Sequence, residues 1–263
     1  MTESKGFDLS GVSFAYDGYT ALRDLDITLP PGRFYGLVGP NGCGKTTLLD
    51  LLTGNKRPQE GRINFRDRDL GQYRRREFAR EVSLVPQDFA IGFAFTVEEV
   101  VLMGRHPYIR RFGSPGAEDY HMVDRAMEQI GIDHLRGRYV NELSGGEKQR
   151  VVVARALAQN TSFLLLDEAT SNLDIQYTLQ IFNVVRKQVR EHKCTVVAVM
   201  HNLNLAGAYS DEIVFMKNGR VAGSGPTLQV LEPGMIREVF GVESRVSLDS
   251  FSQAPQVSFR YHH

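Results

Sequence analysis

Four short, largely apolar runs, each bounded by glycine, proline or polar residues, recur along the chain. Because a strand inside a parallel sheet is buried on both faces, continuous apolar runs of this kind are typical of the central strands of an α/β fold. The runs are Phe34–Val38, Val82–Val85, Phe163–Leu166 and residues 196–200. They predict the core of a sheet with ligand-binding loops at its edge.

Other segments predict strands that are exposed on one face. Residues 12–16 and 21–29 alternate between apolar and polar side chains, and the second segment ends at Pro30-Pro31-Gly32. Glu212–Lys217 is followed by Asn218-Gly219, a strong short-range signal for a hairpin. Residues 48–52 predict a helix after the first glycine-rich turn.

The pattern changes between Gln87 and Leu143, where helical features replace the apolar runs. Thr96 is followed by Glu98 and Glu99, an arrangement that caps a helix and places negative charge in its first turn. Residues 113–116 predict a loop, and residues 120–130 predict another helix. We expect a mainly helical lobe over about residues 88–160, inserted into a strand-rich core of residues 7–87 and 161–243. Residues 244–263 are polar and unpatterned, which predicts a partly disordered tail.

The length of 263 residues suits one α/β domain with such an inserted lobe. The chain has 31 Lys and Arg residues and 31 Asp and Glu residues, so its formal net charge is zero, which argues against a dedicated nucleic-acid-binding protein. Cys43 and Cys194 match no zinc or disulfide framework, so we expect a reducing compartment. The N-terminus lacks the apolar core of a secretory signal, and no run approaches the roughly 18 apolar residues that cross a bilayer. Any action at a membrane is therefore expected to need a partner.

A glycine-rich segment joins Phe34–Val38 to the first predicted helix. It matches G-x-x-x-x-G-K-[ST] at every fixed position and consists of Gly39, Pro40, Asn41, Gly42, Cys43, Gly44, Lys45 and Thr46, followed by Thr47. The glycines allow consecutive backbone N–H groups to turn toward phosphates, and the helix N-terminus adds partial positive charge. Lys45 is expected to reach the β- and γ-phosphates of ATP, and the Thr46 hydroxyl to bind Mg²⁺. The alternative is a chance match in a glycine turn, which the flanking strand and helix disfavour.

An acidic pair, Asp167 and Glu168, directly follows the run Phe163–Leu166. Burial of that strand would bring both carboxylates to its C-terminal end, where open α/β sheets bind ligands. Asp167 is then expected to hold Mg²⁺, and Glu168 to act as general base on the attacking water. An acidic pair at the surface is the simpler alternative, but it is improbable beside a complete phosphate loop.

The phosphate loop alone would also fit kinases, GTPases and helicase-like motors. A third motif narrows the choice, because the octet Leu143-Ser144-Gly145-Gly146-Glu147-Lys148-Gln149-Arg150 leads into an apolar helix over residues 151–158. This segment resembles the LSGGQ signature of the ATP-binding subunits of ABC transporters, and the resemblance runs from about residue 7 to residue 242. It implies an ABC ATPase domain over residues 7–243. The implied fold is a P-loop NTPase core, with a mixed sheet flanked by helices, an antiparallel N-terminal β subdomain and an inserted α-helical subdomain.

Further residues match motifs of this family in the expected order. Tyr16 matches the aromatic residue that stacks on adenine, and Gln87 matches the glutamine that binds Mg²⁺ and couples the core to the helical lobe. Asp174 ends a loop that matches the one crossing the dimer interface. His201 matches the switch histidine that contacts the γ-phosphate. Without the family pattern, Tyr16 would be an ordinary strand aromatic and His201 a structural histidine at a strand end.

The signature also has a physical interpretation. Ser144, Gly145, Gly146 and Glu147 precede a helix and so form another anion-binding N-terminus. The resemblance implies that this end binds the γ-phosphate of ATP held by an opposite subunit, so that a head-to-tail homodimer encloses two ATP molecules. Hydrolysis would then loosen the dimer and pass the motion to a membrane partner.

Three positions depart from the family pattern. Glu147 replaces the usual signature glutamine, Ala169 replaces a proline common in importers, and Asn202 replaces the aspartate that commonly follows the switch histidine. None of these changes removes a residue expected to be catalytic, and the sequence therefore predicts an active ATPase. Those residues are Lys45, Gln87, Glu168 and His201.

Residues 87–107, QDFAIGFAFTVEEVVLMGRHP, are similar to importer subunits for iron–siderophore, haem, cobalamin and related metal chelates. This similarity implies a multi-span permease as partner, a substrate-binding protein as indirect partner, and a peripheral location on the cytoplasmic face of the inner membrane. Phe89, Ile91, Phe93 and Phe95 form either a permease-docking groove or lobe core. The basic run at residues 74–76 is interpreted as a solvated helix face rather than a lipid-headgroup site.

Three alternatives belong to other functional classes. An exporter ATPase is usually fused to its membrane domain, and only Ala169 favours it. A soluble cassette acting on DNA or ribosomes usually has two cassettes, a coiled coil or a basic linker, none of which is evident here. A nucleotide sensor without turnover would be expected to lack Glu168 or His201.

Overall fold

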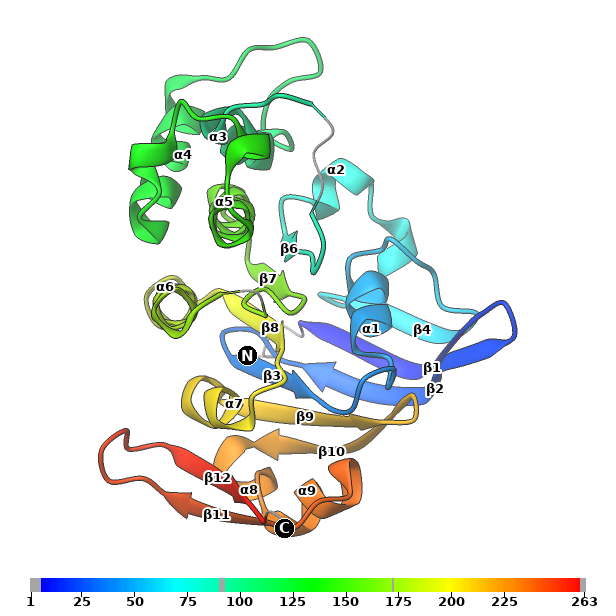
Figure 1. Ribbon diagram of the computed structural model, residues 1–263. Coiled ribbons are helices and arrows are strands. Elements are labelled where there is room, and N and C mark those ends of the chain that lie inside the picture. Colours follow the sequence, from blue (N-terminus) through cyan, green and yellow to red (C-terminus); the bar gives the residue numbers. More distant parts are fainter. Residues whose placement is uncertain (1–5, 90–92, 172, 261–263) are drawn as a thin grey trace. The chain divides into compact units, whose positions relative to one another are not determined.

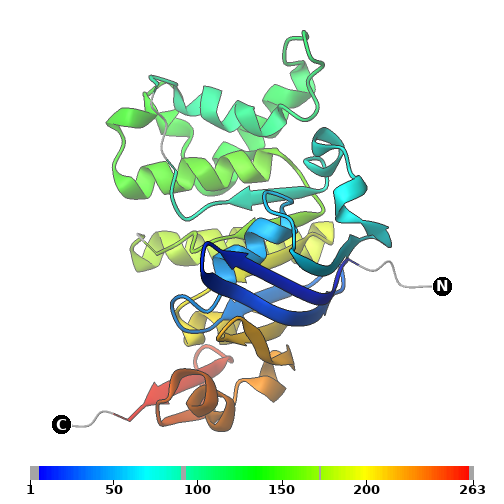
Figure 2. The same ribbon diagram turned by 90° about the vertical axis from the view of Figure 1, so that its right-hand side faces the viewer.

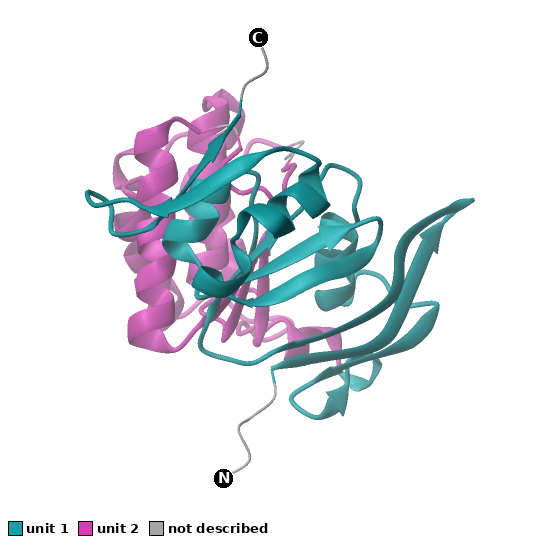
Figure 3. Cartoon of the chain, turned by 90° about the horizontal axis from the view of Figure 1, so that it is seen from below, with its two compact units in different colours: residues 1–73, 197–263 teal, residues 74–196 magenta. Residues whose placement is uncertain are grey.

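The computed structural model describes residues 6–89, 93–171 and 173–260. By its internal contacts the chain forms two compact units (Figure 3). Unit 1 contains residues 1–73 and 197–263, and unit 2 contains residues 74–196. The boundary passes through strand β8 (Thr195–Val199), which is buried along its whole length.

The first strands of the described chain belong to an antiparallel sheet in unit 1. Its strand order is β2-β1-β4-β5, and its strands are β1 (Phe7–Tyr16), β2 (Tyr19–Leu29), β4 (Glu60–Phe65) and β5 (Arg68–Asp69). Apolar side chains of β2 alternate inward from Leu25 to Leu29, as the sequence pattern predicts. Figure 2 shows β1 and β2 running side by side, which agrees with their antiparallel register. This sheet confirms the expected antiparallel N-terminal β subdomain.

A second group of strands in unit 1 carries the first glycine-rich loop. Strand β3 (Phe34–Val38) pairs in parallel with β9 (Glu212–Lys217), and β9 pairs antiparallel with β10 (Arg220–Pro226). The predicted hairpin turn forms at Asn218-Gly219, where both residues have positive φ, at 51° and 78°. Helix α1 (Lys45–Leu52) follows β3 and buries the leucines at positions 48, 49, 51 and 52.

The C-terminal part of unit 1 contains three helices and a hairpin (Figure 1). They are α7 (Leu203–Tyr209), α8 (Thr227–Val230), α9 (Pro233–Phe240), β11 (Ser244–Leu248) and β12 (Pro255–Phe259). The expectation of an unpatterned, partly disordered tail is corrected for residues 244–259, because β11 and β12 pair in antiparallel register. Strand β12 buries only Pro255 and Val257, so its apolar pattern is too short for the sequence to reveal.

Unit 2 contains two parallel strands and the longest helix described. Strand β6 (Val82–Val85) pairs with β7 (Phe163–Leu166), and Val85 lies opposite Leu166. Helix α6 (Ile175–His192) buries one stripe of side chains, including Ile181, Val185 and Val189. Helix α2 (Arg75–Phe78) precedes β6.

The middle of unit 2 is helical, as predicted. It contains α3 (Val97–Leu102), α4 (Ala117–Ile130), α5 (Gly145–Ala158) and short 3₁₀ turns at Met103–Arg105, Asp133–Leu135 and Val140–Glu142. Thr96 caps α3, as the sequence indicated, and Glu99 in addition closes a capping box. Unit 2 extends beyond this lobe to include β6, β7 and α6, so the boundaries of the core and the lobe stay predictions. Within the described part of the chain, no helix combines the length and apolarity needed to span a bilayer.

Candidate functional site

The glycine-rich loop between β3 and α1 has a backbone that only glycine allows at its key positions. Gly44 is the N-cap of α1 with a φ of 102°, and a Cβ there would lie 2.6 Å from the carbonyl oxygen of Ala21. Gly42 has a φ of 75°, but a Cβ there would meet nothing within 4 Å. Glycine is therefore required at position 44 by both space and conformation, and at position 42 by conformation alone.

Lys45 is held inside this loop. Its side chain is 5% exposed, and Nζ donates to the carbonyl oxygens of Gly39 and Pro40, each at 2.9 Å. Cys43 Sγ lies 3.9 Å from Nζ. Burial raises the pKa of the Cys43 thiol, against the opposing effect of the nearby lysine charge. The neutral thiol therefore acts as a small packing group beside a buried cation.

Two contacts that the sequence did not indicate support the loop. The Tyr19 hydroxyl donates to the carbonyl oxygen of Gly42 at 2.8 Å, and the Gly219 N–H donates to the carbonyl oxygen of Cys43 at 3.2 Å. Tyr19 is the first residue of β2, directly after the Gly18 turn, and Gly219 lies in the β9–β10 turn. Both supports come from segments distant in sequence, so no local signal could reveal them.

Tyr16 lies at the end of β1 and is 42% exposed. Its hydroxyl is 3.4 Å from Thr47 Oγ1, and its ring packs edge-on against Phe14. The Lys56 ammonium lies 4.9 Å from the ring centre. The exposed ring thus lies next to the phosphate-loop helix, and Lys56 already occupies one side of the ring.

His201 follows β8 in unit 1 and is exposed. The residue before it, Met200, is buried and its N–H donates to the carbonyl oxygen of Leu37 at 3.1 Å. Asn202 is the N-cap of α7, and its Oδ1 accepts from the N–H groups of Asn204 and Leu205 at 2.9 and 3.2 Å. Asparagine therefore fulfils a capping role at the position where the family commonly has aspartate.

Gln87 and Glu168 lie together in unit 2, and strand register explains why. Val85 pairs with Leu166 in parallel, so the residues two positions further along each strand lie at the same level. Gln87 Nε2 donates to Glu168 Oε2 at 3.1 Å. Glu168 has a positive φ of 49°, a conformation that is costly for a residue with a Cβ. Asp167 is 5% exposed, and its N–H donates to the carbonyl oxygen of Val85 at 2.9 Å.

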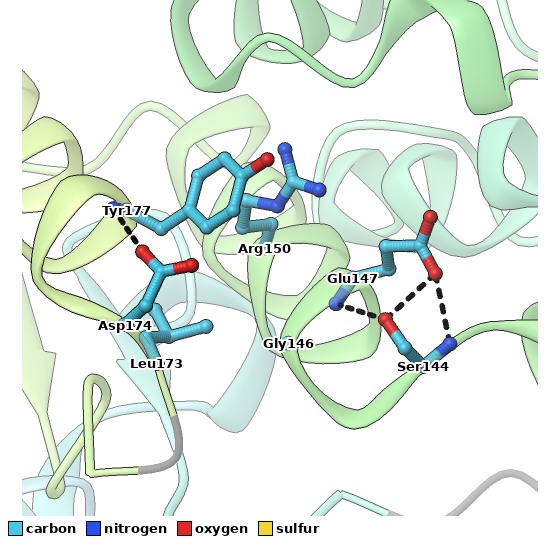
Figure 4. Close-up of a pocket in the computed structure, with 7 residues that line it drawn as sticks. All are labelled: Ser144, Gly146, Glu147, Arg150, Leu173, Asp174 and Tyr177. Atoms are coloured by element: carbon cyan, nitrogen blue, oxygen red, sulfur yellow. Dashed lines mark hydrogen bonds between the residues drawn. The ribbon is translucent and has the colours of Figure 1, made fainter.

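The signature segment begins helix α5 with a complete capping box (Figure 4). The Glu147 N–H donates to Ser144 Oγ at 3.3 Å. Glu147 Oε2 accepts from the Ser144 N–H at 2.8 Å and from the Ser144 hydroxyl at 2.7 Å. These hydrogen bonds, first that of the Ser144 side chain, lower the pKa of the Glu147 carboxyl, which is therefore ionised at neutral pH.

A pocket of about 290 Å³ lies beside this helix start, where α5 meets the start of α6 (Figure 4). Asp174 caps α6, with Oδ1 accepting from the Tyr177 N–H at 3.0 Å. The Arg150 guanidinium lies 4.0 Å from the centre of the Tyr177 ring, a contact that the sequence did not reveal. The pocket thus joins the signature and the loop ending at Asp174, and its lining residues are Ser144, Gly146, Glu147, Arg150, Leu173, Asp174 and Tyr177.

The predicted site residues fall into two groups. Unit 1 contains Tyr16, the loop residues 39–47 and His201. Unit 2 contains Gln87 and the acidic pair, together with the signature segment 144–147 and Asp174. The roles assigned to these residues stay predictions.

Two further predictions concern the aromatic residues that follow Gln87 and the basic run at residues 74–76. Phe93 is 76% exposed and lies 6.4 Å from Phe95, centre to centre, and Arg155 lies 4.5 Å from the Phe89 ring centre. Ile91 lies outside the described residues, so the choice between docking groove and lobe core stays open.

In the basic run, Arg76 Nε donates to the carbonyl oxygen of Pro107 at 2.9 Å, so this side chain fixes a loop as well as facing solvent.

Comparison with known proteins agrees with this set of motifs. Residues 22–171 match the family model described as ABC transporter. The chain is 39% identical to the cobalamin import ATP-binding protein BtuD of Halobacterium salinarum over 251 residues, covering 95% of this chain and 63% of that protein. It is 38% identical to the hemin import ATP-binding protein HmuV of Rhodopseudomonas palustris over 255 residues, covering 94% of this chain and 95% of that protein. The chain thus spans less than two thirds of the cobalamin relative and nearly all of the hemin relative.

Solved structures have the same fold. One is an inward-facing conformation of a metal-chelate type ABC transporter, with a TM-score of 0.84 and 28% identity over 98% of both chains. Another is the dimeric structure of MJ0796, a bacterial ABC transporter cassette, with a TM-score of 0.76 and 27% identity over 84% of this chain and 98% of that chain. These matches confirm the predicted P-loop core with its mixed sheet and helical subdomain. The chain belongs to the ABC transporter family.

Proposed function

We propose that this chain is the ATP-binding and ATP-hydrolysing subunit of an ABC importer that takes up a metal chelate, such as an iron–siderophore, haem or cobalamin. The observation that carries the proposal is the phosphate loop, in which the buried Lys45 ammonium lies at the N-terminus of α1. A buried cation beside a helix N-terminus favours a polyphosphate ligand. Import is favoured over export because the relatives described above are named import proteins.

ATP binding follows from groups within unit 1. Lys45 Nζ would exchange its two carbonyl acceptors for oxygens of the β- and γ-phosphates, which form stronger charge-assisted hydrogen bonds. The exposed ring of Tyr16 would stack on adenine through the face that Lys56 does not approach. His201, exposed at the end of β8, would contact the γ-phosphate.

The residues present fit a Mg²⁺ ion that is held largely by nucleotide phosphates. Magnesium takes oxygen ligands and commonly binds through one or two carboxylates together with substrate phosphates. Asp167 would supply a carboxylate, Gln87 an amide oxygen and Thr46 a hydroxyl. Among the described residues, no three His, Cys, Asp or Glu side chains form a cage that would hold a metal by themselves. When bound, the ion would neutralise charge on the phosphates.

Hydrolysis would use Glu168 as general base. Its carboxylate is oriented by the Gln87 amide, and the positive φ of Glu168 fixes the direction of the side chain from the end of β7. Glu168 would accept a proton from the water that attacks the γ-phosphate. Lys45 would stabilise the charge that develops on the transferred group.

A homodimer would complete the site. The signature helix α5 presents its N-terminus at the pocket beside Asp174, which suits a phosphate held by a second copy of the chain. The dimeric cassette described above supports this arrangement. A multi-span permease and, indirectly, a substrate-binding protein would be the further partners, with the subunit on the cytoplasmic face of the inner membrane.

The proposal is tested with the full-length chain by light scattering and ATPase assay. Glu168→Gln should remove turnover and give a stable dimer in the presence of ATP, whereas Lys45→Ala should lose ATP binding. ATP affinity unchanged in Lys45→Ala would contradict the phosphate-loop assignment. Parental turnover in Glu168→Gln would remove Glu168 from the role of base.

A further inference from the structure

The Glu147 carboxylate at the start of the signature helix engages both hydrogen-bond donors of Ser144. Glu147 Oε2 takes both the backbone N–H and the hydroxyl of Ser144, at 2.8 and 2.7 Å. A serine hydroxyl has a single proton to donate. While that proton is directed to Glu147, the Ser144 hydroxyl cannot donate to a phosphate.

The surroundings indicate that this helix start suits an anion. Arg150 lines the same pocket and is 6% exposed, and its Nε finds no hydrogen-bond partner among the described residues. A buried guanidinium with an unused donor favours a negatively charged ligand. Figure 4 shows the Arg150 guanidinium beside the Tyr177 ring and the Glu147 carboxylate directed to Ser144, on the side of α5 away from Tyr177.

We propose that Glu147 is a built-in competitor for the γ-phosphate that a second copy of the chain would present to Ser144. This inference rests on the proposed function and names what regulates that site. In the free subunit the Glu147 carboxylate satisfies two donors of the site, the Ser144 N–H and the Ser144 hydroxyl. On dimer formation the Ser144 hydroxyl turns from the carboxylate to the phosphate, and the carboxylate remains close by as a like charge.

The consequence is a nucleotide-bound dimer that forms less tightly and opens more readily than one with a neutral side chain at position 147. Glutamine at position 147 tests the effect of the charge alone on the hydrogen-bonded cap, because its neutral amide oxygen can accept the same two hydrogen bonds from Ser144. Glu147→Gln therefore keeps the cap and removes one negative charge, together with the ion pair in which Arg138 Nη1 lies 3.9 Å from Glu147 Oε1. Like charges within several ångströms at a partly exposed site repel enough to change affinity on the order of tenfold.

The chain contains a matched control for the cap itself. Thr96 and Glu99 form the same box at the start of α3, where Glu99 Oε2 accepts from the Thr96 N–H at 2.7 Å and from its hydroxyl at 3.0 Å. Glu99 does not line the pocket. Glu99→Gln therefore makes the same substitution in the same kind of capping box, away from the signature helix and from the Arg138 partner of Glu147.

The experiment compares three full-length chains, Glu168→Gln alone and with either Glu147→Gln or Glu99→Gln added. Light scattering measures the ATP concentration at which half of each protein is dimeric, at low and at high salt. We expect the chain with Glu147→Gln to dimerise at roughly tenfold lower ATP than the other two, with a smaller difference at high salt because ions screen the charge. Thermal unfolding should be alike for the Glu147 and Glu99 variants.

Equal half-dimerisation concentrations in all three chains, or a higher one with Glu147→Gln, would overturn the competitor role while leaving the proposed ATP-driven dimer intact. A difference that persists unchanged at high salt would also overturn it, because the effect would then not come from charge. Absence of ATP-driven dimers in all three chains would overturn the proposed function itself, and the competitor role with it.

Discussion

Gln87 Nε2 and Glu168 Oε2 lie 3.1 Å apart, although 81 residues separate them in the chain. Each residue follows its strand by two positions, and the parallel register of β6 and β7 places the two at the same level. The amide thus orients a carboxylate whose backbone is already held at a positive φ. The pair shows that strand register can bring together two residues of the candidate site.

Replacing Gln87 by leucine tests this orientation. Gln87→Leu removes the donor to Glu168 and the amide oxygen proposed for Mg²⁺, but it leaves the phosphate loop unchanged, so we expect kcat for ATP hydrolysis to fall by about tenfold or more while ATP binding changes little. Steady-state kinetics and direct nucleotide titration measure the two effects separately. Turnover at the parental rate would show that the amide does not orient the base.

The C-terminal hairpin is attached to the helix that follows His201. The Val257 N–H donates to Asn204 Oδ1 at 2.6 Å, and Asn204 Nδ2 donates to the Val257 carbonyl oxygen at 3.4 Å. Asn204→Ala leaves the partly buried backbone groups of Val257 without this partner, so we expect a loss of about 1–3 kcal/mol in the free energy of unfolding.

Hydrogen exchange measures the local effect of Asn204→Ala. Relative to the parent chain, we expect a larger increase in exchange rate in β12 and α7 than in β1. The matched control is Gln256→Ala, which changes an exposed side chain on the same strand. The attachment would be refuted by exchange in β12 that equals that of the parent chain.

The two thiols should resist alkylation in the folded protein. Burial raises the pKa of Cys43 above its usual value of 9.0, and burial raises the pKa of Cys194 to about 12. A raised pKa lowers the thiolate fraction at every pH below it, and thiolate is the reactive form. At pH 7 to 8 we expect slow reaction with iodoacetamide, measured by mass spectrometry.

Denatured protein is the control for the alkylation experiment, and both thiols should react there at the rate of free cysteine. Reaction of Cys43 in the native protein at that same rate would contradict its burial beside Lys45. Slower reaction still after addition of ATP would agree with nucleotide binding at the phosphate loop.

The sequence by itself determined the strands and helices that have a strong local pattern. Phe34–Val38, Val82–Val85 and Phe163–Leu166 are strands with the predicted bounds, because a fully apolar run between breakers has few other ways to be buried. Thr96 and Asn218-Gly219 were equally readable, since a cap and a two-residue turn depend only on neighbouring residues. The motif residues could also be recognised from the sequence, because they occur in the order and spacing typical of the family.

Only the tertiary structure decided the contacts that bring distant segments together. Tyr19 supports Gly42, Arg150 packs on Tyr177, and Asn204 holds Val257, and each pair joins segments with no shared local pattern. The hairpin of β11 and β12 was missed for the same reason, because its two buried side chains give too short a periodicity to detect. Local patterns fix which residues form an element, whereas burial and hydrogen bonding between elements fix what each side chain can do.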